Sequence, residues 1–109
     1  MFGFGKRKAI REIAPGQLYD MVVDGEAVVV DVREPGEFAG GHIPGAINLP
    51  LSSFDASQLP HDQGKTVVLN CAGGVRSGKA LGMCGDIPVD THLAGGMGAW
   101  NRAGLPVER

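Results

Sequence analysis

The sequence predicts an α/β domain with a central, mainly parallel five-stranded sheet and helices on both of its faces. Two runs, residues 27–32 and 66–70, are rich in Val and Leu, which is typical of parallel strands buried on both faces. Such runs alternate with segments of helical periodicity, and this alternation indicates strand–helix–strand units. Function in such sheets gathers at the carboxyl ends of the central strands, so we look for a site there.

The length of 109 residues fits one domain, which we expect to span residues 10–109. Residues 1–9 are basic, and we expect them to form a flexible tail. Four of the ten basic residues stand within the first eleven positions, whereas all twelve acidic residues follow. The remainder of the chain therefore offers no basic face for phosphates, which argues against nucleic-acid binding. The four basic residues are Lys6, Arg7, Lys8 and Arg11.

Composition also bears on the compartment. No stretch approaches the roughly 20 apolar residues of a membrane span, and the basic start lacks the apolar core of a secretory signal. Two cysteines without such a signal favour the cytoplasm and thiols rather than a disulfide. The cysteines are thirteen residues apart, and the three histidines are isolated, so we expect no metal site. These histidines are His42, His61 and His92.

The first half of the chain reads as strand, helix, strand. Residues 10–13 alternate apolar and polar side chains and predict a short edge strand. Pro15 suits the first position of a helix, and an apolar stripe at Leu18, Met21 and Val22 continues it until Asp24-Gly25. The buried strand over residues 27–32 follows and ends in a burst of charge.

The second half begins with a turn cluster at residues 40–45. Residues 51–64 indicate a weak helix or a loop, with Ser52 or Ser53 as a possible N-cap. The remaining expected elements are strands at 46–48, 66–70 and 89–93, and helices at 77–84 and 97–103. Glycines weaken the helix at 77–84, and Gly104 and Pro106 end the closing one.

The candidate site follows the strand at 66–70. That strand stops at Cys71, a glycine-bearing loop comes next, and Arg76-Ser77 opens a helix. Backbone N–H groups and a helix N-terminus near a thiol favour the thiolate, and such environments lower a cysteine pKa to roughly 3.5–7.5. An arbitrary cysteine at a strand end would be structural. The glycines and the arginine beside it instead predict that Cys71 is a nucleophile.

Three motifs closely resemble rhodanese-like domains. Residues 31–38 and 41–50 resemble the N-terminal signature of that family, and residues 71–77 resemble its active-site loop. Residues 93–100, followed by 104–107, resemble its C-terminal motif. The motifs occur in the family's order, and the resemblance covers roughly residues 10–107.

The resemblance implies a sulfurtransferase that needs no metal or organic cofactor. In that chemistry the Cys71 thiolate takes the outer sulfur of a donor such as thiosulfate, forms a persulfide, and passes the sulfur to cyanide, a thiol or a protein acceptor. Four residues separate Cys71 from Arg76. In the resembled superfamily this short loop accompanies a sulfur-sized pocket, whereas related cysteine phosphatases and arsenate reductases carry one residue more.

Roles within the loop are assigned from the same resemblance. We expect N–H groups of residues 72–76 to stabilise charge on the sulfur, as donors do in an oxyanion hole. Ser77 would add a hydroxyl donor or cap the helix. Arg76 would either attract the anionic donor or brace the loop by pairing with Glu34 or Glu37. The predicted loop residues are Ala72, Gly73, Gly74, Val75, Arg76 and Ser77.

Other motif residues are expected to support the site. Asp31 and Arg33 would form a structural ion pair or lie close enough to act at the site, and His42 would be a hydrogen-bonded turn residue rather than a general base. Gly95-Gly96 would let the backbone pass close to the loop. Two further side chains, Trp100 and Cys84, are expected in the core, with a resolving thiol as the alternative for Cys84.

Two rival functions remain. In the first, the domain is a persulfide carrier or a protein-binding module with little activity on thiosulfate, because small residues in the loop leave an open pocket suited to a protein acceptor. In the second, which loop length disfavours, it is a small phosphatase or arsenate reductase. The sequence does not identify the donor or acceptor, and we expect a monomer or a weak dimer.

Overall fold

The computed structural model describes residues 9–61 and 63–109. All five strands pair in parallel, in the order β1-β5-β4-β2-β3. The expected basic tail falls mostly on residues 1–8, which lie outside the described residues. The strands are β1 (Arg11–Ile13), β2 (Ala27–Asp31), β3 (Ile47–Asn48), β4 (Thr66–Asn70) and β5 (Thr91–Leu93). The helices are α1 (Pro15–Val23), α2 (Pro35–Ala39), α3 (Val75–Gly82) and α4 (Gly96–Arg102).

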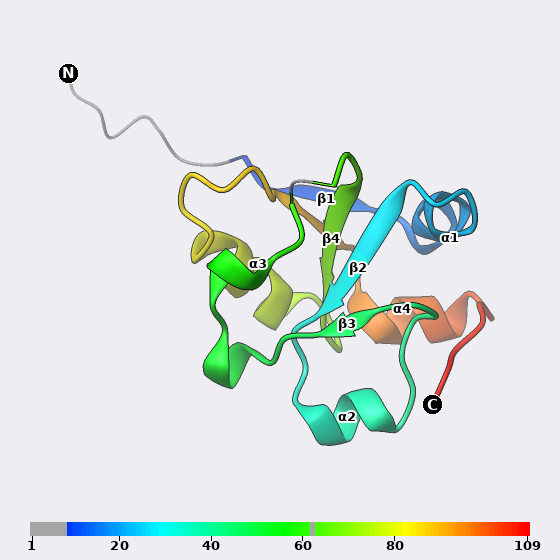
Figure 1. Ribbon diagram of the computed structural model, residues 1–109. Coiled ribbons are helices and arrows are strands. Elements are labelled where there is room, and N and C mark those ends of the chain that lie inside the picture. Colours follow the sequence, from blue (N-terminus) through cyan, green and yellow to red (C-terminus); the bar gives the residue numbers. More distant parts are fainter. Residues whose placement is uncertain (1–8, 62) are drawn as a thin grey trace.

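Side chains of the two central strands alternate between two apolar layers. In β2 and β4, Val30 and Leu69 face a cluster that includes Leu81 of α3, whereas Val29 and Val68 face the opposite cluster. That second cluster holds Leu18 of α1 and Trp100 of α4, both fully buried. Figure 1 shows the result, with α1 and α4 beside one face of the sheet and α3 beside the other. The predicted α/β class and the core position of Trp100 are confirmed.

Helix α1 begins and ends where the sequence places it. Pro15 occupies the first helical position, Leu18 is fully buried, and the C-cap is Asp24. The other two members of the predicted stripe, Met21 and Val22, are half-buried and pack against the same cluster. The edge position of β1 is also confirmed, since it pairs with β5 alone in the sheet order.

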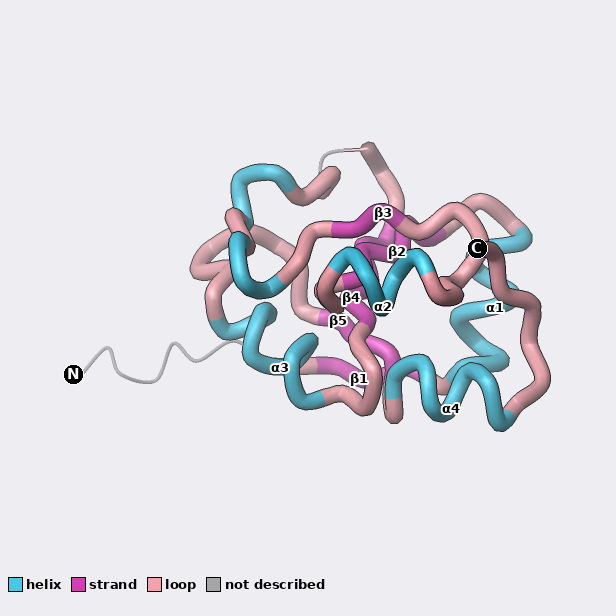
Figure 2. Tube along the Cα trace, turned by 90° about the horizontal axis from the view of Figure 1, so that it is seen from below, coloured by secondary structure: helices cyan, strands magenta, loops and turns pink. Residues whose placement is uncertain are grey.

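Helix α2 was not predicted. Its signals are present, because Pro35 opens it and the Glu34 and Glu37 side chains exchange hydrogen bonds with each other's backbone in a capping box. A Glu in place of the usual Ser or Thr at the N-cap made this box inconspicuous. Figures 1 and 2 together place α2 beyond the carboxyl ends of the central strands. The charged residues that follow β2 therefore belong to a helix that lies over the sheet edge where the site is located.

Two local expectations were wrong, the N-cap at Ser52 or Ser53 and the bounds of the helix predicted at 77–84. Among the described residues of the stretch 51–64, two short 3₁₀ turns occur, Leu51–Ser53 and Ala56–Gln58, and neither Ser52 nor Ser53 is an N-cap. Asp55 caps the second turn by accepting from the Ser57 backbone N–H at 3.0 Å. Helix α3 starts two residues earlier than predicted and ends at Gly82, so Cys84 follows the helix. No helix within the described ranges is long and apolar enough to span a membrane.

Candidate active site

The loop that follows β4 starts at Cys71, and α3 begins four residues later. Gly74 is the N-cap of α3 and has φ 107°, a left-handed conformation that favours glycine. The turn between β5 and α4 packs against this loop, since Met97 N–H donates to Cys71 O at 2.8 Å and Gly98 N–H donates to Ala72 O at 3.0 Å. A Cβ on Gly96 would collide with Cys71 O and Ala72, which confirms the close backbone approach expected there.

The thiol of Cys71 is buried and surrounded by donors. Gly74 N–H donates to its Sγ at 3.0 Å, and the hydroxyl of Ser77 lies 3.4 Å from the sulfur. Burial acts to raise the pKa of this thiol, but the hydrogen bonds outweigh it and lower the pKa below its ordinary value. The donors are the Ser77 hydroxyl and the backbone N–H groups of Ser77, Gly74 and Gly73. The loop therefore favours the thiolate.

The mouth of the loop is open to solvent. Ala72 and Gly73 are exposed, and Val75 is 79% exposed, whereas Cys71 is 1% exposed. The sulfur thus sits at the base of a shallow, partly apolar rim.

Arg76 braces the loop against α2. Its guanidinium contacts both carboxylate oxygens of Glu37, at 2.7 and 2.9 Å. The Arg76 hydrogen bond is the largest cause that lowers the pKa of Glu37 from 4.5 to about 2, and the pair raises the pKa of Arg76 in turn. Of the two acceptors considered from the sequence, the structure selects Glu37.

Glu34 has another partner. Besides capping α2, its carboxylate accepts from the Ser52 hydroxyl at 2.7 Å and from the Ser52 backbone N–H at 3.3 Å. Glu34 therefore ties α2 to the 3₁₀ turn at Leu51–Ser53 rather than to the loop that holds Cys71. Its predicted support of the site is indirect.

Asp31 and Arg33 form a buried ion pair. Arg33 Nε and Nη2 reach the Asp31 carboxylate at 2.8–3.1 Å, and Nη2 also donates to Gly41 O at 2.7 Å. The Asn48 amide holds the carbonyls of both residues, at 3.0 and 2.9 Å. Among the two roles left open by the sequence, this geometry favours the structural one, because the pair fixes the turn after β2.

His42 belongs to the turn, as expected. Its ring stacks on Phe38 with 3.8 Å between centroids, and Nδ1 lies 2.8 Å from Phe38 O. Its backbone bridges Glu108, so the end of the chain is held beside α2. Cys84 packs in the same apolar cluster as Cys71 and donates to Ala80 O at 3.4 Å, consistent with a core side chain.

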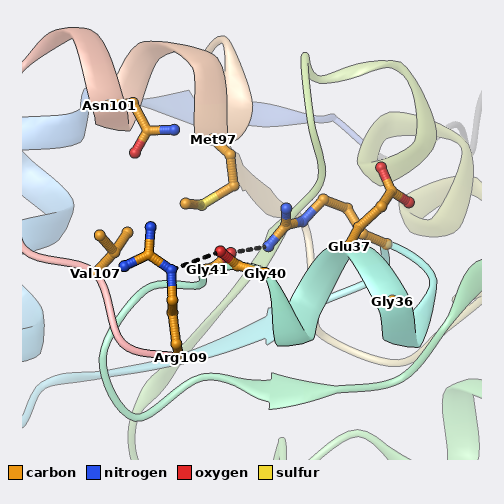
Figure 3. Close-up of a pocket in the computed structure, with 9 residues that line it drawn as sticks. Gly36, Glu37, Gly40, Gly41, Met97, Asn101, Val107 and Arg109 are labelled. Atoms are coloured by element: carbon orange, nitrogen blue, oxygen red, sulfur yellow. Dashed lines mark hydrogen bonds between the residues drawn. The ribbon is translucent and has the colours of Figure 1, made fainter.

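A cavity of about 320 Å³ lies between α2, α4 and the end of the chain. Glu37 lines it from α2, Met97 and Asn101 line it from α4, and Val107 and Arg109 close it from the end of the chain (Figure 3). Within residues 9–61 and 63–109, no three His, Cys, Asp or Glu side chains lie close enough together to hold a metal ion.

His92 is the site residue that the sequence did not reveal. It lies on β5 and is 5% exposed, and its Nδ1 is 2.7 Å from Ser77 Oγ. In the sequence it is an isolated histidine in a strand, 21 positions after the cysteine. The register that pairs it with Leu69 of β4 is a property of the folded sheet. The contacts that lead from Cys71 through Ser77 to His92 therefore could not be predicted from the sequence and are seen only in the structure.

The model of the rhodanese-like domain matches residues 14–103. The chain belongs to this family. The rhodanese-related protein of Thermoplasma volcanium has a similar crystal structure, with a TM-score of 0.79, 32% identity, and coverage of 90% of this chain and 97% of that one. The family assignment and the rhodanese-like fold expected from the three motifs are therefore confirmed.

Relatives of this rhodanese-like chain include a thiosulfate sulfurtransferase, GlpE of Actinobacillus succinogenes, 31% identical with 92% of both chains covered. An uncharacterized protein of Synechocystis is 48% identical over 86% of this chain. The chain spans 54% of that relative's length. The chain is thus a rhodanese-like domain with sulfurtransferase homologues, in a family whose members use sulfur donors and acceptors.

Proposed function

We propose that this protein is a sulfurtransferase in which Cys71 carries the sulfur as a persulfide. The observation that carries the proposal is the pair of polar contacts at Cys71 Sγ: Gly74 N–H donates to it at 3.0 Å, and the Ser77 hydroxyl lies 3.4 Å away. Donors already placed at the sulfur stabilise negative charge there without reorganisation. The thiosulfate sulfurtransferase name of a full-length relative supports the same chemistry.

The reaction proceeds by two displacements. The Cys71 thiolate attacks the outer sulfur of thiosulfate, the bond between the two donor sulfurs breaks, and its electron pair leaves with sulfite. A cyanide ion or a thiolate then attacks the terminal sulfur of the Cys71 persulfide, and the Cys71 thiolate leaves. No net oxidation of the protein occurs. Because Arg76 is already paired with Glu37, we assign it to bracing the loop during both steps.

Mass spectrometry of the intact protein tests this proposal. After incubation with thiosulfate and removal of the donor, wild type should gain one sulfur atom and lose it on addition of cyanide. Cys71→Ser should gain none, whereas Cys84→Ala should behave as wild type. Sulfur uptake by folded Cys71→Ser, or its loss in Cys84→Ala, would contradict the assignment.

A persulfide carrier that serves a protein acceptor is the second candidate. The exposed rim at Ala72, Gly73 and Val75 favours it, since an apolar side chain at the mouth of the loop suits contact with another protein better than a small anion. Comparing turnover on thiosulfate and cyanide with transfer from a persulfidated protein separates the two. Val75→Asp should impair the second reaction far more than the first if the chain is a carrier.

We also propose that the protein works in the cytoplasm, as a monomer or a weak dimer. Reductants in the cytoplasm protect a low-pKa thiolate from oxidation. Neither Cys71 nor Cys84 forms a disulfide. Alkylation of Cys71 in intact cells, followed by mass spectrometry, would show whether it is held reduced, and size-exclusion chromatography at several concentrations would give the assembly state.

A further inference from the structure

A second polar chain leads away from Cys71 into the sheet. His92 is 5% exposed and faces the layer of α3, on the same side of the sheet as its register partner Leu69. Its Nδ1 lies 2.7 Å from Ser77 Oγ, and Ser77 Oγ lies 3.4 Å from Cys71 Sγ. Core packing alone does not explain a buried histidine that lies two contacts away from a thiol.

The far nitrogen of the ring is oriented by a carboxylate. His92 Nε2 lies 3.3 Å from Glu12 Oε2 on β1. An ionised carboxylate can only accept, so its position favours the tautomer with the proton on Nε2. In the neutral ring Nδ1 is then the acceptor, and it faces the hydroxyl of Ser77.

The Ser77 hydroxyl has one proton and three neighbours that could take it. Gly74 O lies 3.2 Å from Oγ, His92 Nδ1 lies 2.7 Å away, and Cys71 Sγ lies 3.4 Å away. When Nδ1 is an acceptor at the shortest of these distances, the proton points to His92. Ser77 Oγ is then free to accept the S–H of Cys71.

We propose that Cys71, Ser77 and His92 form a proton relay that generates the Cys71 thiolate, with Glu12 as the residue that orients the imidazole. The relay deepens the proposed function and rests on Cys71 being its nucleophile. In the relay, His92 and Ser77 position and move protons, and neither touches the sulfur donor.

The step balances without an oxidant or a reductant. The S–H bond of Cys71 breaks and its proton moves to Ser77 Oγ, while the former hydroxyl proton of Ser77 moves to His92 Nδ1. The products are a thiolate, a neutral serine and an imidazolium whose Nε2–H still faces Glu12. Ser77 now accepts from His92 Nδ1–H and donates to the Cys71 thiolate. The transfer that ionises Cys71 therefore also makes Ser77 a hydrogen-bond donor to the thiolate.

The groups packed around His92 come from β1, α3 and the end of β4. Glu12 on β1 is the charged group that contacts the ring, and α3 contributes neutral Ser77 and Gly78, whose added Cβ would lie 3.7 Å from His92 Cε1. Cys71, at the end of β4, is the titratable group on the other side of Ser77.

Titration of the Cys71 thiolate tests the relay. The absorbance of the thiolate near 240 nm is followed against pH for each protein, and that of its Cys71→Ala counterpart is subtracted. His92→Leu removes the group that takes the proton and should therefore move the midpoint up by about one to two pH units. Ser77→Ala should do the same, and adding His92→Leu to Ser77→Ala should move it no further. The exposed His61→Asn is the matched control and should leave the midpoint unchanged.

The reciprocal measurement guards against a variant that fails to fold. Nitrogen chemical shifts of the His92 ring, recorded by NMR, report its proton occupancy in wild type and in Cys71→Ala. Because coupling between two sites is mutual, loss of the thiol must shift the titration of His92. An unchanged midpoint in folded His92→Leu, or an unchanged His92 titration in Cys71→Ala, would overturn the relay. Neither measurement needs a sulfur donor. A failure of the relay can therefore be distinguished from a failure of the proposed sulfur transfer.

Discussion

Arg76 of the loop and Glu37 of α2 meet in a two-pronged ion pair, with N–O distances of 2.7 and 2.9 Å. Arg76 lies in the first turn of α3, directly after the loop, and Glu37 completes the capping box of α2. The pair therefore joins the helix that carries the site to the helix that lies beyond the strand ends.

Glu37→Gln should cost little stability at neutral pH and should remove a specific acid sensitivity. The folded pKa of Glu37 is about 2, against 4.5 without its partners, so its contribution is complete above about pH 4.5 and is lost as pH falls toward 2. Because both side chains are partly exposed, we expect the ion pair to contribute about 0.5–1 kcal/mol to the free energy of unfolding. Salt should reduce this contribution. Urea unfolding at pH 6 and pH 3 should show wild type and variant converging at the lower pH. A difference that grows on acidification would contradict this.

Asp31→Asn should be much more damaging. It leaves the guanidinium of Arg33, a residue 7% exposed, without its buried counter-charge, and such losses cost about 3–5 kcal/mol. The exposed Asp86→Asn is the matched control and should change the free energy of unfolding by less than about 0.5 kcal/mol. Urea unfolding measures both. If Asp31→Asn kept full stability but lost sulfur transfer, the pair would belong to the site rather than to the fold.

Gly96→Ala should disturb the loop from behind. Gly96 has φ +57°, and a Cβ there would press on the backbone of Cys71 and Ala72. Left-handed strain and overpacking together should cost about 2–5 kcal/mol and reduce sulfur uptake by Cys71. Gly104→Ala measures the left-handed strain alone, because Gly104 has φ +70° with open space around it. This variant should lose only about 1–2 kcal/mol of stability, without any effect on sulfur uptake. Equal effects of the two variants would show that the close contact is unimportant.

The ionisation of Cys71 should make stability rise with pH. A folded pKa below the unfolded value of about 8.5 means that the unfolded chain binds more protons between the two values. The contribution is thus fully present above about pH 8.5 and is lost as pH falls through the folded pKa. The free energy of unfolding of wild type, minus that of Cys71→Ser, should therefore increase from pH 6 to pH 9. A difference that is flat over this range would mean that the loop does not favour the thiolate.

Local patterns determined the architecture. The Val-rich runs at 27–32 and 66–70 specify the two central strands, because only a strand buried on both faces can use so many apolar residues without a polar face. The order of motifs and the short distance from Cys71 to Arg76 identified the family and its loop, since those features are contiguous in the chain. Helix α2 could also have been found from Glu34, Pro35 and Glu37, had a Glu been considered as an N-cap.

Pairings across the fold were decided by the tertiary structure. Whether Arg76 meets Glu34 or Glu37 depends on which carboxylate α2 turns toward the loop, and the capping box settles that by holding Glu34 toward Ser52. His92 reaches Ser77 only because β5 lies beside β4 in register, with α3 packed above both. The sequence by itself determined the thiol, its loop and the sheet around them. The tertiary structure alone decided that His92, 21 positions after Cys71, lies behind its thiol. Such a contact follows from the order of strands in the sheet and not from any local spacing in the sequence.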